Sequence, residues 1–172
     1  GMSGNRLEVN VHVITGAVTS AQNIIKSVNR AGLDVVDIIL QPLASSEAVL
    51  SAEERELGVA MVDLGGGTTD LAIFLDGSIR HTAVLPIGGQ NLTKDLAIGL
   101  LTSQTDAEKI KVQHGIARTE LVHGHQMVEV PSVGDRPPRQ FTRRDIAEIL
   151  EPRVEEMFDL VKREIVRAGY EG

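Results

Sequence analysis

The residues most able to do chemistry lie close together in one short segment. They are Asp63, Gly65, Gly66, Gly67, Thr68 and Thr69. Because glycines have no Cβ atom, their backbone N–H groups can closely approach a bound anion. The Asp63 carboxylate suits Mg²⁺ held through its water shell, because Mg²⁺ gives up its waters reluctantly. The run predicts a loop that holds the terminal phosphates of a nucleotide and their Mg²⁺.

The elements on either side of the glycines favour this interpretation over a plain tight turn. An unbroken apolar run, Val59 to Val62, precedes Asp63 and suits a strand buried on both faces. A second apolar run, Leu71 to Leu75, follows at once, so the glycines form the tip of a hairpin. No Gly-Lys-Ser/Thr sequence follows and no helix begins after the glycines, so the loop is not a Walker A motif.

Composition excludes several classes of protein. The chain has 172 residues, is 42% hydrophobic and 2% aromatic, contains no cysteine and carries a formal net charge of −7. Its apolar content predicts an aliphatic core rather than disorder. The negative charge argues against a general nucleic-acid binder. The sequence shows no disulfide framework, and no run long enough for a membrane span or typical of a signal peptide.

The N-terminal third alternates strand and helix patterns, which predicts an α/β fold with right-handed crossovers. Alternation predicts a half-buried strand over Leu7–Val13, and helical periodicity follows from about Ser20 to Ala31. A strand over Val35–Leu40 and a short helix over Leu43–Leu50 are expected next. Ser51 and Glu54 then have capping-box spacing, which predicts a further helical turn.

The rest of the chain begins with a predicted three-strand meander. Its strands are Val59–Leu64, Leu71–Leu75 and Ile79–Leu85, with an Asp76-Gly77 turn between the second and third. Later expected elements are helices over Leu92–Leu100 and Asp106–His114, strands at Leu121–Val122 and Met127–Val130, an exposed loop over Ser132–Gln140, and a helix capped by Thr142 with Asp145. Pro152 is expected to kink that helix or to begin another.

In this context the chain resembles the actin-like ATPase superfamily, whose fold is ribonuclease H-like. Asp63 to Asp70 would be its second phosphate loop. Within the superfamily the chain is most similar to the FtsA family of bacterial cell-division proteins. The stretches that carry this resemblance are Val11–Gly16, Pro42–Ser46, Gly65–Ile73, Ile79–Thr82, Ala107–Gly115, Val130–Gly134, Arg136–Arg139 and Ile149–Arg153.

The resemblance implies a partial actin-like fold, with part of the first lobe and most of the second. Residues 1–50 would be first-lobe residues ending in the helix that crosses between lobes. Residues 51–89 and 152–172 would form the core subdomain of the second lobe, and residues 90–151 its small outer subdomain. The first phosphate loop, the adenosine motif and the membrane-binding tail of the family have no counterpart in the sequence, so the chain is expected to be a central fragment.

The resemblance also implies roles for three further residues. Glu108 and Lys111 match positions that contact the nucleoside, with the carboxylate accepting ribose hydroxyls and the lysine stem lying along the base. On residue type alone, an exposed helical ion pair is the preferred explanation, and the resemblance is what favours the site. Gln41 stands where superfamily chaperones carry a glutamate that orients the attacking water. Because an amide cannot take up a proton, Gln41 can at most orient that water.

A basic cluster stands out in this acidic chain. It comprises Arg136, Arg139, Arg143 and Arg144 around Phe141, with Arg153 beyond. A solvated surface is the plain explanation, whereas the resemblance implies a surface that docks the acidic, apolar C-terminal tail of the division protein FtsZ. His123 and His125 suggest half a metal site, but with no third ligand in view they are expected to be solvated loop histidines.

The resemblance implies an ATP- and Mg²⁺-binding protein that polymerises and links the FtsZ ring to the cytoplasmic membrane. It would act in the cytoplasm, at the inner face of the membrane at the division site, with other division proteins and through a membrane tail absent here. Whether it hydrolyses ATP is left open, with weak activity at most and none expected of this chain alone. The alternatives are a hydrolase like the seventy-kilodalton chaperones or the sugar kinases, and a pure peptide-docking module.

Overall fold

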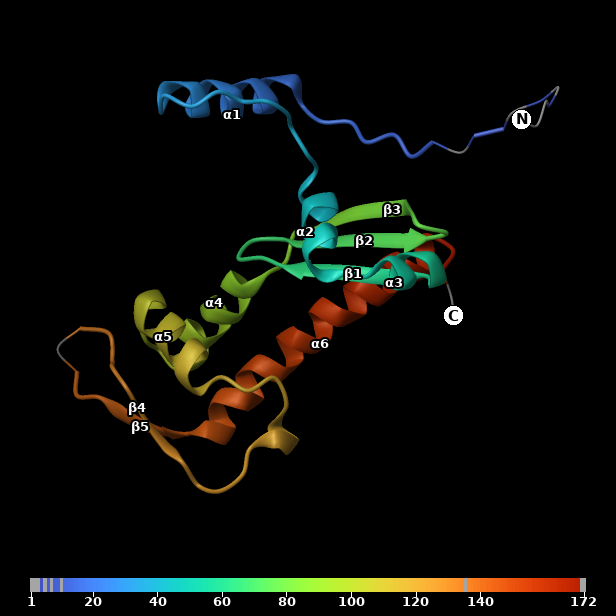
Figure 1. The fold of residues 1–172 in the computed structure, drawn as a ribbon. Coiled ribbons are helices and arrows are strands. Elements are labelled where there is room, and N and C mark those ends of the chain that lie inside the picture. Colours follow the sequence, from blue (N-terminus) through green and yellow to red (C-terminus); the bar gives the residue numbers. More distant parts are fainter. Residues whose placement is uncertain (1–3, 5, 7, 10, 135, 171–172) are drawn as a thin grey trace. The chain divides into compact units, whose positions relative to one another are not determined.

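The computed structural model describes residues 4, 6, 8–9, 11–134 and 136–170 (Figure 1). The chain divides into two compact units. The first comprises residues 1–59 and 73–81, and the second residues 60–72 and 82–172. No helix among the described residues is both long enough and apolar enough to span a membrane.

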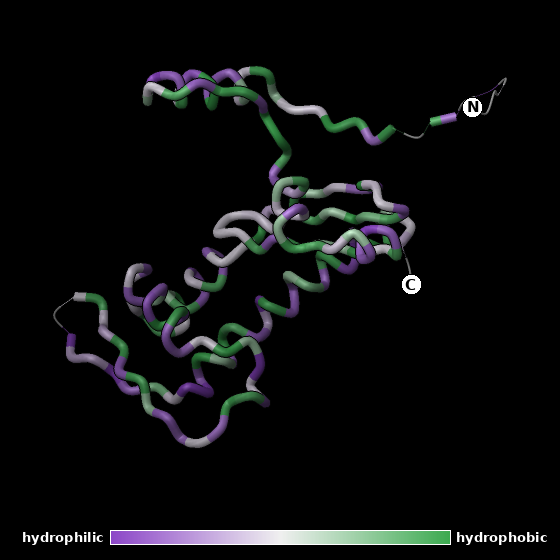
Figure 2. The backbone as a smooth tube through the Cα atoms, in the orientation of Figure 1, coloured by the Kyte–Doolittle hydropathy of each residue, from purple (hydrophilic) through white to green (hydrophobic). Residues whose placement is uncertain are grey.

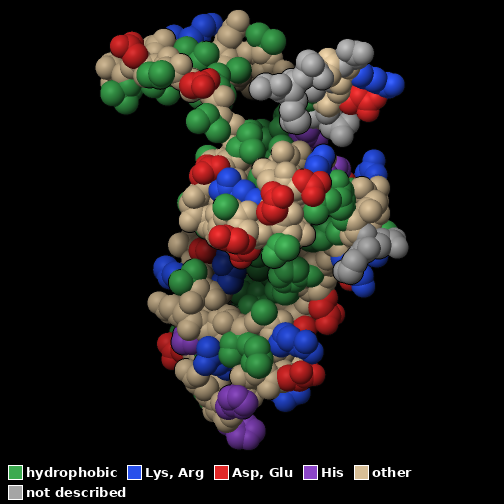
Figure 3. Space-filling view, turned by 45° about the vertical axis from the view of Figure 1, so that its right-hand side comes forward, with side chains coloured by type: hydrophobic (Ala, Val, Ile, Leu, Met, Phe, Trp, Pro, Cys, Tyr) green, Lys and Arg blue, Asp and Glu red, His purple; other side chains and the backbone are tan. Residues whose placement is uncertain are grey.

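The first unit begins with an isolated helix. The expected helical segment is confirmed as α1 (Val18–Arg30), but none of its residues is buried. Figure 2 shows hydrophobic and hydrophilic residues side by side around its turns, and Figure 3 shows hydrophobic side chains at its surface. Its periodicity is therefore sufficient to predict the helix, even though none of its residues is buried.

The two strands predicted around α1 are wrong. Residues 11–17 and 33–40 have no regular structure, and Val36 is 98% exposed. Leu7 and Asn10 of the first predicted strand lie outside the described residues. A strand is held by hydrogen bonds to a neighbouring strand, and no strand among the described residues pairs with either segment. Alternating apolar residues are thus present without the partner that would make them a sheet.

Two short helices follow, α2 (Gln41–Val49) and α3 (Ala52–Leu57). Pro42 lies in the first turn of α2, where its missing N–H costs nothing. The predicted capping box at Ser51 is confirmed by reciprocal bonds with Glu54 of 3.2 and 2.8 Å. Arg55 joins the two helices, because its guanidinium bonds Glu47 at 2.6 Å and the Ser46 carbonyl at 2.8 Å.

The predicted meander is confirmed as a three-stranded sheet of β1 (Val59–Leu64), β2 (Thr69–Leu75) and β3 (Ser78–Leu85), in the order β1-β2-β3. Asp76 and Gly77 both have positive φ, 51° and 68°, as the tight turn of such a hairpin requires. Residues 71–74 of the central strand are buried, whereas only Met61 is buried in β1. The expectation that the first strand is buried on both faces is therefore wrong, because Ala60 and Leu64 are exposed and the other residues of β1 except Met61 are only half-buried.

The remaining second-unit elements are α4 (Gly89–Gly99), α5 (Gln104–His114), the 3-10 turn η1 (Thr119–Leu121), β4 (Met127–Val130), β5 (Arg139–Thr142) and α6 (Arg143–Arg167). β4 and β5 pair antiparallel, with Val128 opposite Phe141. One apolar cluster joins α4, α5, β4 and α6, and Phe141 of β5 packs against it. Its buried members are Leu96, Leu100, Ala107, Ile110, Val128, Val130, Ile146 and Leu150.

Three expectations for this region are corrected. Leu121 belongs to η1 and Val122 to no strand, so the strand predicted there is wrong. The predicted loop over Ser132–Gln140 ends early, because Arg139 and Gln140 begin β5. Pro152 begins no second helix but lies within the continuous α6, so that alternative of the prediction is wrong. The Thr142–Asp145 capping box is confirmed.

Candidate functional site

The glycine hairpin between β1 and β2 closes tightly. The backbone N–H of Gly65 donates to the Thr68 carbonyl at 2.9 Å, and the buried Thr69 hydroxyl donates to the Ile87 carbonyl at 2.7 Å. Among the described residues, none accepts a hydrogen bond from the backbone N–H of Gly66 or Gly67. Two adjacent amides at the exposed tip are therefore available to an anionic ligand.

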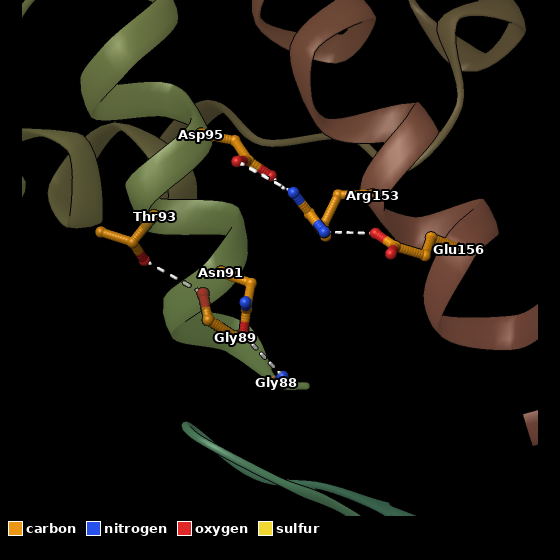
Figure 4. Close-up of polar contacts among 7 residues, drawn as sticks. All are labelled: Gly88, Gly89, Asn91, Thr93, Asp95, Arg153 and Glu156. Carbon is orange, nitrogen blue, oxygen red and sulfur yellow. Dashed lines mark hydrogen bonds and ion pairs between the residues drawn. The ribbon is translucent and has the colours of Figure 1, made fainter. Parts of the chain in front are cut away.

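The first turn of α4 packs directly on this hairpin. The N–H groups of Gly89 and Gln90 donate to the carbonyls of Gly65 and Gly66 at 2.9 and 2.8 Å. A Cβ atom on Gly88 would lie 2.6 Å from both of these carbonyl oxygens, so only glycine fits there. The Gly88 N–H is itself capped by the Asn91 side chain at 3.0 Å (Figure 4). The hairpin and the helix thus hold each other in one geometry.

Helix α5 adds a charged pair beside that turn. Lys111 Nζ lies 2.7 Å from Glu108 Oε2 and donates to the Gly89 carbonyl at 3.0 Å. It also donates to the Thr93 hydroxyl at 2.8 Å, and that hydroxyl bonds the same Glu108 oxygen. The predicted pair therefore forms, but it is anchored to α4 and is more than an isolated surface ion pair.

The electrostatics of the pair follow from these bonds. The hydrogen bond from Lys111, and then that from Thr93, lower the pKa of the Glu108 carboxyl below its usual range. Glu108 is therefore ionised at neutral pH and can accept hydrogen bonds from a ligand's hydroxyl groups. The side chain of Lys111 is mostly buried, so its aliphatic stem offers apolar surface beside its charge.

Thr93, Gly88 and Gly89 were not identified as site residues from the sequence. Gly88-Gly89 is visible there only as a break before a helix. Thr93 is one of several threonines, and its role depends on a contact with α5 across 15 positions of the chain. The one local signal is its position four residues after Gly89, whose carbonyl its hydroxyl also bonds at 3.1 Å (Figure 4).

The other predicted ligand residues lie in different settings. Asp63 lies near the end of β1 with its side chain half-buried, and it interacts with another residue of the chain. The Thr68 hydroxyl donates to Asp70 at 3.3 Å. Gln41 begins α2 in the first unit, whereas the glycine hairpin belongs to the second. The roles of Asp63 and Gln41 remain predictions.

The arginines that form a cluster in sequence have separate partners in the structure. Arg139 bonds the carbonyl of Leu100 and lies 5.3 Å from the centre of the Phe141 ring. Arg143 donates to the His114 carbonyl at 3.1 Å, and Arg144 to Glu148 at 3.2 Å. Most of these charges therefore already have partners within the fold.

Two of these arginines, however, line a groove of about 540 Å³ on the second unit. Arg136 and Arg139 lie along it with apolar side chains that include Ala97, Leu101 and Val133. Such a mixture of positive charge and apolar surface suits a peptide with acidic and apolar residues. The basic, apolar part of the predicted docking surface is thus concentrated at Arg136 and Arg139.

Arg153 belongs to a different contact, which joins α4 to α6. Its guanidinium bonds Asp95 at 2.6 and 3.2 Å and also reaches Glu156 (Figure 4). The hydrogen bonds that Arg153 donates to Asp95, together with the charge of that carboxylate, raise the pKa of Arg153 above its usual value. Elsewhere, His123 and His125 are exposed, and no three His, Asp or Glu side chains of the described chain converge on a metal position.

Comparison with known proteins places the chain among cell-division proteins. Residues 60–171 match the family model described as "Cell division protein FtsA". The chain is 54% identical over 171 residues to the cell division protein FtsA of Pseudomonas aeruginosa, covering 99% of this chain and 41% of that protein. It is 48% identical to the FtsA of Escherichia coli K12, over 97% of this chain and 40% of that protein.

Solved structures agree on the fold. The MreB5 structure of Spiroplasma citri bound to ADP matches with a TM-score of 0.63 at 22% identity, over 87% of this chain and 48% of that chain. The ethanolamine utilization protein EutJ of Carboxydothermus hydrogenoformans matches with a TM-score of 0.64 at 25% identity, over 88% of this chain and 44% of that chain. Both are actin-like proteins, so the predicted partial actin-like α/β fold is confirmed.

Proposed function

Because the chain belongs to the FtsA family of cell-division proteins, as its resemblance predicted, we propose that it carries the second-lobe half of an ATP site. Gly65, Gly66 and Gly67, with Thr68 and Thr69, hold the terminal phosphates. Asp63 holds Mg²⁺ through water, and Glu108 and Lys111 contact the nucleoside. ATP and Mg²⁺ are thus the proposed ligands of the family member in which this chain occurs.

One observation carries this proposal: the glycine hairpin and the Glu108–Lys111 pair meet on the same turn of α4. Gly89 donates to the hairpin through its N–H and accepts from Lys111 through its carbonyl, at 2.9 and 3.0 Å. A ligand with a phosphate chain at one end and a hydroxylated sugar at the other fits two such groups held at a fixed separation. That MreB5 was solved with ADP is consistent with this type of ligand for the fold.

The chemistry that these residues supply is binding rather than proton transfer. The free amides of Gly66 and Gly67 donate to phosphate oxygens, and the Lys111 ammonium adds positive charge nearby. Mg²⁺, when bound, neutralises phosphate charge. Gln41 can orient a water but cannot accept its proton, which favours slow hydrolysis over the turnover of a chaperone or a sugar kinase.

For the whole protein we propose the role that its relatives' name indicates, in cell division. It would polymerise and link the FtsZ ring to the cytoplasmic membrane, acting in the cytoplasm at the inner membrane face. The chain spans 41% of the length of the Pseudomonas relative, so these activities are proposed for the whole protein in which it occurs. Membrane contact would require a segment outside this chain.

We propose that the small subdomain over residues 90–151 docks the C-terminal tail of FtsZ. Every residue of the apolar cluster that joins α4, α5, β4, β5 and the first half of α6 lies between 92 and 150, so this segment has its own core. Arg136 and Arg139 give the groove positive charge, and Phe141 packs beneath Arg139. Arg143 and Arg144 lie at the start of α6, where they would add to the long-range field.

The test of nucleotide binding uses the full-length protein that contains this sequence. Hydrogen exchange is measured with ATP and Mg²⁺, with ATP and EDTA, and without nucleotide. We expect slower exchange of the Gly66 and Gly67 amides with Mg-ATP, because phosphate oxygens then accept from them. Unchanged exchange at both amides under saturating Mg-ATP would reject the phosphate assignment.

A further inference from the structure

We propose that Thr93 is a positioning residue for sugar recognition: its buried hydroxyl fixes the Glu108 carboxylate so that one oxygen faces a ribose. This inference rests on the proposed function of Glu108 and adds a residue that neither the sequence motifs nor the family resemblance single out. Thr93 touches no ligand in this account. It acts through Glu108 and Lys111.

The contacts place Thr93 between the two proposed nucleoside ligands. Its side chain lies in α4 and the residue is only 7% exposed. Its hydroxyl bonds Glu108 Oε2 and accepts from Lys111 Nζ at 2.8 Å. Both ligand residues lie on α5, so Thr93 is the side chain through which α4 sets the position of both.

Counting protons shows which bond the hydroxyl makes. A threonine hydroxyl has one hydrogen to donate, and here two acceptors lie in reach, the Gly89 carbonyl at 3.1 Å and Glu108 Oε2. The ionised carboxylate is the stronger acceptor and the closer one, so the hydrogen goes to Glu108. The Lys111 ammonium then donates to a lone pair of the same hydroxyl. In this arrangement the hydroxyl, the carboxylate and the ammonium each have a partner.

This arrangement leaves one carboxylate oxygen for a ligand. Thr93 and Lys111 both bond Oε2, and no described residue bonds Glu108 Oε1. The Glu108 side chain is 50% exposed, so Oε1 is reachable from solvent. A carboxylate that is held by one oxygen and presents the other is pre-organised to accept a sugar hydroxyl, which lowers the entropy lost on binding.

The experiment compares ATP with 2′,3′-dideoxy-ATP, which lacks the two hydroxyls that Glu108 would bind. Both affinities are measured for the full-length protein and for Thr93→Val, which keeps the shape and removes the hydroxyl. We expect the wild type to prefer ATP by about tenfold, because hydrogen bonds to a charged group are of that strength. In Thr93→Val the ratio of the affinity for ATP to that for 2′,3′-dideoxy-ATP should fall towards one.

Two matched variants separate positioning from folding. Thr93→Ser retains a hydroxyl and should restore most of the preference. Thr102→Val removes the hydroxyl of another buried threonine, which donates to the Pro131 carbonyl at 2.6 Å, and should leave the preference as in the wild type. If Thr93→Val does not fold, Thr93→Ala lacks the same hydroxyl with less bulk. An unchanged preference in the hydroxyl-free variant, or an equal loss in Thr102→Val, overturns the inference.

A measurement without nucleotide keeps the inference distinct from the proposed function. NMR titration of the Glu108 carboxyl in the nucleotide-free protein should show its pKa rising in Thr93→Val and not in Thr93→Ser or Thr102→Val. If that pKa is the same in Thr93→Val and in the wild type, Thr93 does not hold the carboxylate and the inference is wrong. If the pKa rises but the wild type binds no ATP, the positioning contact stands and the proposed nucleotide site fails.

Discussion

The backbone N–H of Gln90 donates to the carbonyl oxygen of Gly66 at 2.8 Å, which joins the first turn of α4 to the tip of the glycine hairpin. Gly89 makes the neighbouring bond to Gly65. A helix N-terminus that would otherwise attract an anion is therefore occupied by the loop itself. The amides left for a ligand are those of the hairpin, and α4 holds them in position.

This contact predicts that Gly88→Ala destabilises the fold through steric overlap of the new Cβ atom and not through backbone strain. Gly88 has an extended φ of −165°, but a Cβ there would lie 2.6 Å from the carbonyl oxygens of Gly65 and Gly66. Neither backbone atom can rotate away, so we expect a loss of about 1–3 kcal/mol in the free energy of unfolding. Urea denaturation of the full-length protein measures it.

Gly89→Ala is the matched control for that variant. A Cβ on Gly89 would lie 3.5 Å from Lys111 Nζ and 3.7 Å from the Gly65 carbonyl, which are ordinary contacts. We expect its free energy of unfolding to lie within about 0.5 kcal/mol of the wild-type value. Equal losses in the two variants would mean that the close approach of hairpin and helix does not decide the cost.

Much of this region could be predicted from the sequence, because its signals are local. Asp76-Gly77 can adopt two successive positive φ values, and Ser51 with Glu54 and Thr142 with Asp145 can cap helices without help from distant residues. The glycine hairpin is also specified by residues that are neighbours in the sequence. In each case the residues that specify the structure lie within a few positions of each other.

The errors involve partners that are distant in sequence or absent from the described chain. The alternating valines before α1 and the apolar run at 35–40 meet no neighbouring strand, so they form none. β5 was missed because Arg139 and Gln140 have little strand propensity, and only pairing with β4 makes them a strand. The contacts of Thr93 could not be predicted, since they depend on how α5 packs against α4.

The contacts of the Glu108 carboxyl predict that part of the free energy of unfolding is lost in acid. Lys111 and then Thr93 lower its pKa below the ordinary value of 4.5, so its folded pKa is depressed. Its contribution to the free energy of unfolding is therefore present above pH 4.5 and is lost as the pH falls through the folded pKa. Glu108→Gln should be less stable than the wild type at pH 7, and the difference should shrink at low pH. A difference that is constant from pH 7 to pH 3 would contradict this.

The ion pair between Arg153 and Asp95 should stabilise the packing of α4 against α6. The two side chains are 29% and 25% exposed, so replacing Arg153 by Met leaves a partly buried carboxylate without its partner. We expect a loss of about 1–3 kcal/mol in the free energy of unfolding. Arg144→Met breaks a pair whose side chains are 63% and 56% exposed, and it should cost less than about 0.5 kcal/mol. Equal costs would show that burial is not the deciding factor.

The groove predicts a charge-dependent interaction with the FtsZ tail. Arg136 is exposed and lines the groove, so Arg136→Glu should weaken binding of a labelled tail peptide by about tenfold, and raising the salt concentration should weaken wild-type binding. Arg167→Glu makes the same charge change at the end of α6 and should leave the affinity within about twofold. Fluorescence anisotropy measures both, and equal effects of the two reversals would reject the groove as the docking site.

The most direct test of the proposed nucleotide site compares two carboxylates of the full-length protein by calorimetry with Mg-ATP. Asp63 would act on the metal, normally the largest local charge, whereas Glu108 would contact only sugar hydroxyls. We predict that Asp63→Ala weakens Mg-ATP binding by at least tenfold more than Glu108→Ala does. When EDTA removes Mg²⁺, Asp63→Ala should bind ATP as the wild type does, whereas Glu108→Ala should still bind about tenfold more weakly because it lacks the sugar contacts. Equal losses with Mg²⁺ present, or a larger loss in Glu108→Ala, would contradict the proposed site.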